Sequence, residues 1–377
     1  MTSPEPRRIT VAVHPPYTLH IGPGVIRALP AWLRSGLPGA RCALVTDENV
    51  ARLHLPGVRE AMEAAGLETS VFTIPAGEAS KTRAVKERLE DQMIEARLGR
   101  DTAVVALGGG VVGDLAGFTA ATYHRGVPCV QVPTTLLAMV DASVGGKTGV
   151  DHPRGKNLIG AFHQPAAVFA DIDFLGTLPE REFRSGLAEV VKCGVIRDAA
   201  LLDTLARDSG AVAARAPALL TGLVASACAI KAEVVAADER EGDLRRILNF
   251  GHTIGHALET LSGYALSHGE AVSIGMVAES RLAVRLGMLS REAAEAIEAS
   301  LSGLGLPVRI PPDGGMTAWA ILEAARRDKK ARQGRIVCAL PRALGAMARG
   351  PGGFGIPLED VLAAEVLSTM HGGCSPA

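Results

Sequence analysis

The sequence predicts an α/β N-terminal domain with a Rossmann-like parallel sheet, followed by a mostly α-helical C-terminal domain. Up to about residue 175, short apolar β-type runs alternate with helical patterns. Such alternation implies parallel strands joined by right-handed crossovers. From about residue 180, long Ala- and Leu-rich segments with helical periodicity dominate instead. We therefore expect two domains, comprising residues 1–178 and 179–377.

The strands of the first domain are expected where β-type runs end in polar or glycine-rich turns. Thr102–Leu107 is a continuous apolar run, as expected of a strand buried on both faces. The helical spacing of Val58–Ala65 and of the charged, amphipathic Thr82–Ala96 predicts two connecting helices. The complete set of expected strands is Ile9–Val13, Tyr17–Ile21, Cys42–Thr46, Thr69–Ile74, Thr102–Leu107 and Cys129–Val132.

The second domain is expected to consist of helices closed by a short irregular or β region. Gly305–Thr317 is rich in Gly and Pro and predicts a loop, whereas Leu340–Pro357 predicts irregular structure or short strands. A last helix is expected at Leu358–Thr369. The other helical segments are Phe183–Val195, Ala199–Arg207, Ala216–Ala237, Gly251–Leu261, Glu270–Leu286, Arg291–Leu304 and Ala318–Arg327.

Composition excludes several classes of function. The 39 basic and 40 acidic residues leave a net charge of −1, without the basic surplus of a general nucleic-acid or anionic-membrane binder. The longest charge-free apolar stretches, Val127–Val140 and Ala216–Ile230, fall short of the ~20 residues that span a bilayer. The six cysteines form no C-x-x-C pair, which argues against a thiolate zinc cage or a disulfide framework. We expect a soluble cytoplasmic protein.

A glycine-rich turn follows the strand expected at Thr102–Leu107. Gly108–Asp114 contains G-x-G-x-x-G, in which glycines let backbone N–H groups approach a pyrophosphate at a helix N-terminus. The match to a dinucleotide fingerprint is incomplete, because no acidic residue lies about 20 positions later. A tight strand-to-helix turn with close packing explains the same glycines.

Two lysines lie in a second glycine-rich stretch. Lys147 and Lys156 are expected on loops, where ammonium groups beside backbone donors suit a phosphate or a phosphorylated sugar. The Gly-Gly-Lys-Thr segment lacks the first P-loop glycine, whose position is Asp141, so a nucleoside triphosphatase is excluded. Solvated surface lysines remain the alternative explanation.

Three histidines and three glutamates have the spacing of a metal site. His252 and His256 are four residues apart on one helix face, and His252 and His268 are expected at consecutive helix starts. A mononuclear site needs about three protein ligands, commonly His and carboxylate. The candidate carboxylates are Glu189, Glu259 and Glu270. An internal Glu189–Lys192 pair with helix-capping histidines is the alternative.

Taken together, these motifs resemble the 3-dehydroquinate synthase family, in order and in spacing, over roughly residues 10–345. The resemblance rests on Gly108–Asp114, Val132–Leu137, Val140–Thr148, Gly155–Phe162, Gly186–Lys192, Leu248–His256, His268–Ala271 and Asp328–Lys330. It implies a sugar-phosphate cyclase with an NAD-binding domain over 1–178 and a metal- and substrate-binding helical domain over 179–377. Two departures are a Gly/Pro-rich insert at Pro351–Pro357 and the run that begins at Arg335.

The resemblance also implies the roles of individual residues. The metal ligands, for zinc or cobalt, would be Glu189, His252 and His268. The NAD contacts would be Asp47, Glu78, Lys81, Gly110, Val111, Val112, Gly113, Asp114, Thr134, Thr135, Lys147, Lys156, Phe174, Leu175, Gly176 and Thr177. The substrate pocket would contain Asp141, Lys147, Asn157, Lys192, Lys231, Arg245, Asn249, His256 and one of Lys329 and Lys330. Arg125 would reach the substrate phosphate of a neighbouring subunit, which implies a homodimer.

The implied reaction converts 3-deoxy-D-arabino-heptulosonate 7-phosphate to 3-dehydroquinate and phosphate, in the shikimate pathway of aromatic amino-acid biosynthesis. It would proceed by transient oxidation by NAD, β-elimination of phosphate, re-reduction and aldol cyclisation, in one site between the two domains. The alternatives are the amino-analogue cyclase that makes 5-amino-5-deoxy-3-dehydroquinate, a metal-dependent polyol dehydrogenase of related fold and a non-catalytic NAD-binding scaffold. The cyclase that makes 2-deoxy-scyllo-inosose is disfavoured, because such enzymes diverge around Gly-Gly-Lys-Thr.

Overall fold

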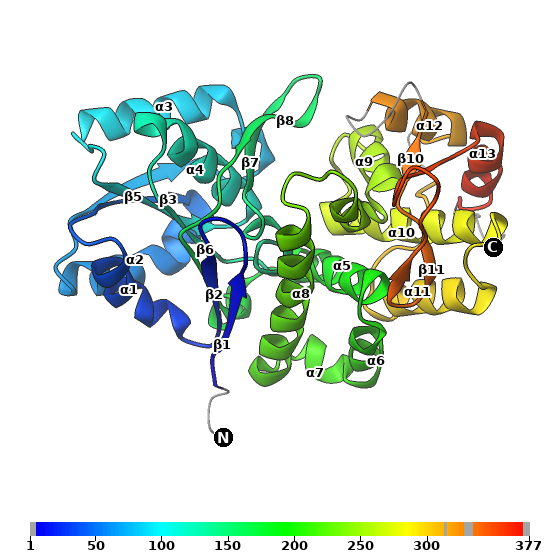
Figure 1. Cartoon of the computed structure of the whole chain (residues 1–377), viewed down its shortest axis with the longest axis horizontal. Coiled ribbons are helices and arrows are strands. Elements are labelled where there is room, and N and C mark those ends of the chain that lie inside the picture. Colours follow the sequence, from blue (N-terminus) through cyan, green and yellow to red (C-terminus); the bar gives the residue numbers. More distant parts are fainter. Residues whose placement is uncertain (1–4, 313–314, 328–334, 372–377) are drawn as a thin grey trace. The chain divides into compact units, whose positions relative to one another are not determined.

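The computed structural model describes residues 5–312, 315–327 and 335–371, and these form two compact units. The first unit comprises Met1–Pro179 and Arg215–Ala236, and the second comprises Glu180–Ala214 and Ala237–Ala377. The sequence-based division assigns Arg215–Ala236 to the C-terminal domain, whereas in the structure this segment packs with the first unit. Helix α8 (Pro217–Ala237) accounts for most of that segment (Figure 1).

The first unit is built on a seven-stranded sheet with the order β1-β2-β9-β6-β5-β3-β4. β1 pairs antiparallel with β2, and every other pairing in this sheet is parallel. The parallel, Rossmann-like sheet predicted from the sequence is therefore confirmed. Its strands are β1 (Arg7–Val11), β2 (Tyr17–Gly22), β3 (Arg41–Asp47), β4 (Thr69–Ile74), β5 (Thr102–Gly108), β6 (Cys129–Pro133) and β9 (Ala167–Asp171).

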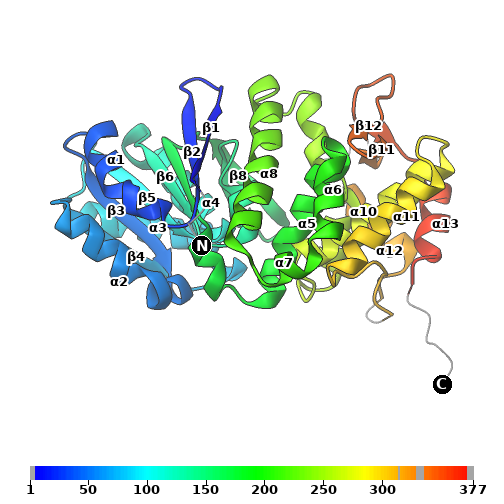
Figure 2. The same cartoon turned by 90° about the horizontal axis from the view of Figure 1, so that it is seen from below.

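Helices cover both faces of this sheet (Figures 1 and 2). One face carries α3 (Arg83–Glu95) and α4 (Gly110–Thr122), and the other carries α1 (Leu29–Gly36) and α2 (Glu48–Ala64). β5 is buried along its whole length, as its continuous apolar run predicts. α2 begins ten residues before the helical pattern expected at Val58, because the Asp47 carboxylate accepts hydrogen bonds from Asn49 and Val50 and caps the helix.

Short helical turns join these elements. They are η1 (Val25–Ala28), η2 (Glu78–Ser80), η3 (Tyr123–Arg125), the π-helical turn η4 (Ala138–Ala142) and η5 (Ile172–Thr177). A separate antiparallel hairpin of β7 (Lys147–His152) and β8 (Gly155–Phe162) packs on α4. Lys147 and Lys156 therefore lie on strands, and the expectation that they lie on loops is wrong. Glycine-rich strands carry a weak β signal, so the sequence pattern did not reveal this hairpin.

The second unit is mostly helical, which confirms the second half of the predicted fold class. Three very short strands, β11 (Pro341–Ala343), β12 (Ala346–Met347) and β13 (Ile356–Pro357), lie in the region expected to be irregular or β, Leu340–Pro357. A fourth, β10 (Val337–Cys338), precedes that region and pairs with β13. Its helices are α5 (Glu180–Ile196), α6 (Ala199–Arg207), α7 (Ser209–Ala213), η6 (Leu244–Asn249), α9 (His252–Leu261), α10 (His268–Arg285), α11 (Arg291–Gly303), α12 (Ala318–Arg327) and α13 (Asp360–Ser368).

α8 is the one helix in the described part of the chain that is long and apolar enough, by length and composition, to cross a membrane. It contains all of the apolar stretch Ala216–Ile230 except Ala216 and continues past Lys231, so it is longer than the charge-free run suggested. Buried residues make up 61% of its most apolar window. Core helices of soluble proteins pass the same test, so the length of α8 is weak evidence for a membrane span.

Candidate active site

Three helices of the second unit bring Glu189, His252 and His268 together. Glu189 lies in α5, and the two histidines are the first residues of α9 and α10, as the sequence predicts. One ligand atom from each of the three residues lies within 4.8 Å of the others. The Nε2 atoms of His252 and His268 are 3.6 and 3.5 Å from the same oxygen, Oε1 of Glu189. Two imidazoles and a carboxylate are a donor set that suits a divalent zinc-type ion with an open coordination position.

The close packing of α10 against α5 and α9 makes this cluster possible. A Cβ atom on Gly269 would collide with the backbone of Ser185, and one on Gly275 would collide with the backbone of Gly251. Ser185 also accepts a hydrogen bond from the Gly269 N–H through its Oγ at 2.9 Å. α10 starts at His268 because Ser267 and Glu270 form a reciprocal capping box. The close helix packing and the helix cap together place the two imidazoles beside Glu189.

Both histidines are held through Nδ1, the ring nitrogen that faces away from Glu189. Nδ1 of His252 lies 3.1 Å from the carbonyl oxygen of Phe250, and Nδ1 of His268 lies 3.5 Å from Oε2 of Glu259. Burial alone would lower the pKa of His268, but the hydrogen bonds and charges of Glu189 and Glu259 raise this pKa to about 9. The cluster is therefore an electronegative site that attracts a cation.

The three candidate carboxylates have different roles in the structure. Glu189 is 1% exposed and contacts both imidazoles, and its other oxygen pairs with the Lys192 ammonium one turn along α5. Glu259 contacts the far nitrogen of His268. Glu270 completes the helix cap and pairs with Arg181 at 2.6 Å, which holds the Glu270 pKa below its usual range. Of the three, only Glu189 faces both Nε2 atoms.

The other predicted site residues of the second unit lie on α5, η6 and α9. Arg245 is 2% exposed, and its guanidinium donates to the Glu239 carbonyl. The Asn249 amide donates to Glu241 at 2.5 Å. The His256 ring lies 5.3 Å from that of His252, centroid to centroid. Lys192 is almost fully buried beside Glu189. Lys329 and Lys330 lie outside the described residues.

In the first unit, predicted NAD-binding residues lie at the carboxyl ends of the parallel strands. In the sheet, β3 lies between β4 and β5. Along the chain, β4 follows β3 on one side, and the chain then crosses to form β5 on the other side of β3. Ligands of open α/β sheets bind outside the carboxyl ends of the strands at such a switch point. Asp47 ends β3, and Gly108 ends β5 at this point. The sheet topology therefore fits a dinucleotide site here.

The glycine turn fits both of the explanations that the sequence left open. Gly109 precedes α4, and none of the described side chains caps that helix end, so an anion can lie against its first N–H groups. Gly113 has a packing role, because a Cβ there would lie 2.7 Å from Oε1 of Gln131 on β6. Gly110, Val111, Val112 and Gly113 are the first four residues of α4.

A polar network around the buried Lys81 lies beside this turn. The Lys81 ammonium is 2.6 Å from a carboxylate oxygen of Asp114 and 2.6 Å from Oδ1 of Asn157. Burial would lower the pKa of Lys81, but the charges of Asp114 and Glu78 raise it. Lys156 pairs with Glu78 at 3.3 Å. The structure thus joins five residues that the resemblance assigned to the cofactor or the substrate.

The remaining predicted residues of the first unit occupy turns and helix ends. Thr134 and Thr135 follow β6, and Phe174, Leu175, Gly176 and Thr177 lie in η5 after β9. The Lys231 ammonium, on α8, is 2.6 Å from Oδ1 of Asp141 in the π-helical turn η4. Lys147 is exposed on β7. Arg125 is exposed in η3 with a left-handed backbone, φ +70°.

Sequence reasoning missed one acidic residue of the second unit. Glu279 on α10 is fully buried, and its carboxylate accepts hydrogen bonds from the backbone N–H groups of Gly251 and Ile254. A glutamate directly after the mostly apolar run Ala271–Ala278 was the available signal, because a buried carboxylate requires partners. Glu279 supports the turn that precedes His252.

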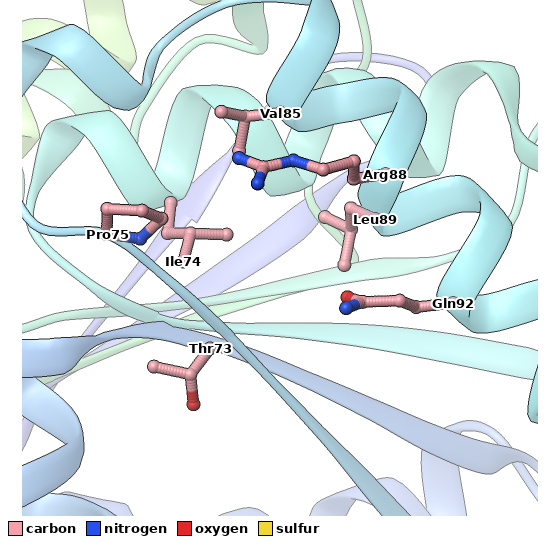
Figure 3. Close-up of a pocket in the computed structure, with 7 residues that line it drawn as sticks. All are labelled: Thr73, Ile74, Pro75, Val85, Arg88, Leu89 and Gln92. Atoms are coloured by element: carbon pink, nitrogen blue, oxygen red, sulfur yellow. The ribbon is translucent and has the colours of Figure 1, made fainter.

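A small hollow in the first unit is lined by none of these groups. Figure 3 shows side chains of α3 beside the end of β4, with Arg88 and Gln92 on either side of Leu89 and Thr73 as a further polar group. The lining residues are Thr73, Ile74, Pro75, Val85, Arg88, Leu89 and Gln92. None of them was predicted to contact NAD, metal or substrate.

The fold and the family models agree on the class of protein. An α/β unit with a nucleotide-type switch point and a helical unit with a His₂Glu cluster are the combination expected of an enzyme that uses a nucleotide cofactor and a divalent metal ion. Residues 71–185 match the model for the N-terminal part of 3-dehydroquinate synthase, and residues 186–331 match the model for its C-terminal part. The chain belongs to the 3-dehydroquinate synthase family.

Curated relatives support this membership over most of the chain. The 3-dehydroquinate synthase of Symbiobacterium thermophilum is 52% identical over 327 residues, covering 86% of this chain and 91% of the relative. That of Synechococcus sp. is 49% identical over 334 residues, covering 87% and 90%. The shikimate-pathway function predicted from the sequence agrees with these relatives.

Solved structures of related synthases share the fold. A 2-epi-5-epi-valiolone synthase from Streptomyces hygroscopicus subsp. jinggangensis, solved with NAD⁺ and Zn²⁺ bound, is 30% identical, with a TM-score of 0.85 and coverage of 94% of this chain and 96% of that one. A 2-deoxy-scyllo-inosose synthase in complex with carbaglucose-6-phosphate, NAD⁺ and Co²⁺ has a TM-score of 0.88 at 24% identity, covering 97% and 100%, and this likeness concerns the fold.

Proposed function

We propose that this chain converts 3-deoxy-D-arabino-heptulosonate 7-phosphate to 3-dehydroquinate and inorganic phosphate, using one NAD and one divalent metal ion. The single observation that carries the metal assignment is the convergence of Glu189, His252 and His268 within 4.8 Å. The site lysines of the first unit supply the cationic groups that a substrate with a phosphate and a carboxylate requires.

The residues present fit both cofactors. Glu189, His252 and His268 would hold a Zn²⁺ or Co²⁺ ion, which supplies Lewis-acid polarisation of substrate hydroxyls when bound. The sheet edge at Asp47 and Gly108–Asp114 would hold NAD, with its pyrophosphate at the start of α4, and NAD supplies reversible hydride transfer when bound.

The chain's own groups would bind the substrate and stabilise its charge. Lys147 and Lys231 would bind its anionic groups, with the Asp141 carboxylate fixing the direction of the Lys231 ammonium. Arg245 would bind the planar carboxylate in two-point fashion, since the Glu239 carbonyl orients its guanidinium. Lys192 would offset the charge of Glu189 and donate to a substrate oxygen. Asn157, Asn249, His256 and one of Lys329 and Lys330 complete the proposed set.

A direct assay tests this function. Purified protein would be incubated with the heptulosonate phosphate, catalytic NAD and Co²⁺, while phosphate, 3-dehydroquinate and NADH absorbance are followed. We expect equal amounts of phosphate and dehydroquinate, no accumulation of NADH, and loss of both products on chelation. Absence of phosphate release would contradict the proposal, and preferred turnover of the amino analogue would assign the alternative cyclase. Net NADH formation with polyols would assign a dehydrogenase.

We further propose a cytoplasmic homodimer in which Arg125 completes the neighbouring subunit's phosphate site. Its exposed position in η3 is compatible with reaching another chain. The test mixes two inactive variants, Arg125→Ala and Glu189→Gln, under conditions in which subunits exchange. Partial recovery of activity supports a shared site, because hybrid dimers contain one site with both native residues. A monomer by light scattering, or no recovery after proven exchange, contradicts it.

A further inference from the structure

Two carboxylates contact the imidazole of His268 from opposite ends. Oε1 of Glu189 lies 3.5 Å from Nε2, and Oε2 of Glu259 lies 3.5 Å from Nδ1. Glu259 is only 4% exposed and lies near the end of α9. Burying a carboxylate costs several kcal/mol unless it is hydrogen-bonded or paired, so the contact with His268 accounts for an acidic residue at this position.

The neighbouring histidine is held in the same manner by a different group. Nδ1 of His252 contacts the Phe250 carbonyl oxygen, and its Nε2 faces Oε1 of Glu189. Metal-ligating histidines usually donate the second ring N–H to a carbonyl or carboxylate, which fixes the tautomer and the ring orientation. The Glu259 carboxylate thus contacts Nδ1 of His268 in the same way that the Phe250 carbonyl contacts Nδ1 of His252.

We propose that Glu259 is a positioning residue, which holds the proton of His268 on Nδ1 and aims the Nε2 lone pair at the metal ion. This inference rests on the proposed metal site at Glu189, His252 and His268. Glu259 itself contacts neither the ion nor the substrate. α9 carries His252, His256 and Glu259 at spacings of four and three residues, so the helix presents all three on one side.

A competing arrangement uses the same residues as ligands. His256, Glu259 and His268 also offer ligand atoms within 4.8 Å of one another, so they could hold a second ion. The two arrangements differ in stoichiometry. A proton on Nδ1 of His268 prevents this nitrogen from binding an ion, so the positioning role allows one ion per chain.

The test measures metal binding by the full-length, metal-free protein, and the His268 tautomer in the same protein at pH 10, where the imidazole is neutral. Co²⁺ is titrated into the wild type and Glu259→Gln by calorimetry and visible absorbance, and ¹⁵N spectra of the imidazoles report which ring nitrogen is protonated. We expect one Co²⁺ per chain in both proteins and a dissociation constant ten- to hundredfold larger in Glu259→Gln, with loss of the pure Nδ1–H tautomer of His268. Glu295→Gln, an exposed change on α11, is the control and should match the wild type.

The outcomes separate this inference from the proposed function. Equal Co²⁺ affinity and an unchanged tautomer in Glu259→Gln would overturn the positioning role alone. Two ions per wild-type chain, one of them lost in Glu259→Gln, would overturn it in favour of a second site. No Co²⁺ binding by the wild type would overturn both proposals. If Glu259→Gln folds poorly, judged by circular dichroism, Glu259→Asp provides the second variant, and restoration of the Nδ1–H tautomer by its carboxylate supports the role.

Discussion

The carboxylate of Glu279, on α10, accepts a hydrogen bond of 2.7 Å from the backbone N–H of Gly251. It accepts a second from Ile254 N–H at 3.3 Å, and so caps α9, whose own N-cap residue is a glycine without a side chain. The residue that follows Gly251 is His252. A fully buried side chain thus determines where the helix begins and where the His252 imidazole lies.

Replacement of Glu279 should therefore weaken both the fold and metal binding. We expect Glu279→Ala to lower the free energy of unfolding by about 2–4 kcal/mol, because two buried N–H groups lose their acceptor. Glu279→Gln retains an acceptor and should lose less. Urea unfolding of the metal-free protein measures the effect, with Glu295→Gln as the control. A loss below about 0.5 kcal/mol in Glu279→Ala would contradict the capping role.

Removal of a metal ligand should abolish metal content and turnover. We expect His268→Ala to lose bound metal and at least about a hundredfold in turnover, with the helical circular dichroism retained. Glu189→Ala should show the same losses and unfold more readily, by about 3 kcal/mol, because it leaves the buried Lys192 ammonium without its carboxylate. Elemental analysis and urea unfolding provide the measurements. Full activity in either variant would refute the metal assignment.

Metal affinity should rise with pH. The pKa of His268 is raised to about 9 in the metal-free protein, and the ion binds only the neutral imidazole. The apparent association constant for Co²⁺ should increase about tenfold per pH unit from pH 7 to 8.5 and level off above about pH 9. A constant affinity over this range would show that His268 releases no proton on binding.

The same raised pKa links pH to the stability of the metal-free fold. Because the folded-state pKa lies above the ordinary value of 6.5, the protonated imidazole stabilises the fold fully below pH 6.5. This contribution is lost as the pH rises through 9. His268→Gln should remove that component of the pH dependence, as measured by unfolding at pH 6 and pH 9.5. An identical pH dependence in wild type and variant would contradict the assignment.

Two lysines predicted to bind ligands should behave differently when replaced. Lys81→Met leaves the partly buried Asp114 carboxylate without its ammonium partner, so we expect a loss of about 2–3 kcal/mol in stability. Lys147 is exposed, so Lys147→Met should change stability by less than about 0.5 kcal/mol while reducing kcat/KM at least about tenfold. Unfolding and kinetic assays of both variants separate the two roles, and equal destabilisation would contradict this distinction.

In the Gly/Pro-rich segment Pro351–Pro357, replacement of one glycine should destabilise the fold, and replacement of its neighbour should not. Gly353 has φ +96°, and a Cβ there would collide with the Asp243 carboxylate, which also accepts the Phe354 N–H at 2.9 Å. Gly352 has no neighbour within 4 Å of such a Cβ. We expect Gly353→Ala to destabilise the protein by about 1–3 kcal/mol, and Gly352→Ala to have little effect. Asp243 lies two residues before Arg245, so the KM should rise only in Gly353→Ala.

The sequence by itself determined the elements whose signals are local. Gly251 and Ser267 mark helix starts that place His252 and His268 at the beginning of α9 and α10, and the apolar run Thr102–Leu107 identifies a strand buried on both faces. Helix caps and hydrophobic runs depend on residues that are close in sequence, so a single amino-acid sequence is enough to predict them. The motif set identified the family because many short patterns occur in one order.

Only the tertiary structure decided which groups meet. Residue spacing left Glu189, Glu259 and Glu270 as candidate carboxylates, and only the family resemblance pointed to Glu189. The packing of three helices places Glu189 at both Nε2 atoms, Glu259 at Nδ1 of His268 and Glu270 beside Arg181. The β7–β8 hairpin and the membership of α8 in the first unit have the same origin. Contacts between elements depend on shape and on close approach at residues such as Gly269, and no local spacing in the sequence encodes them.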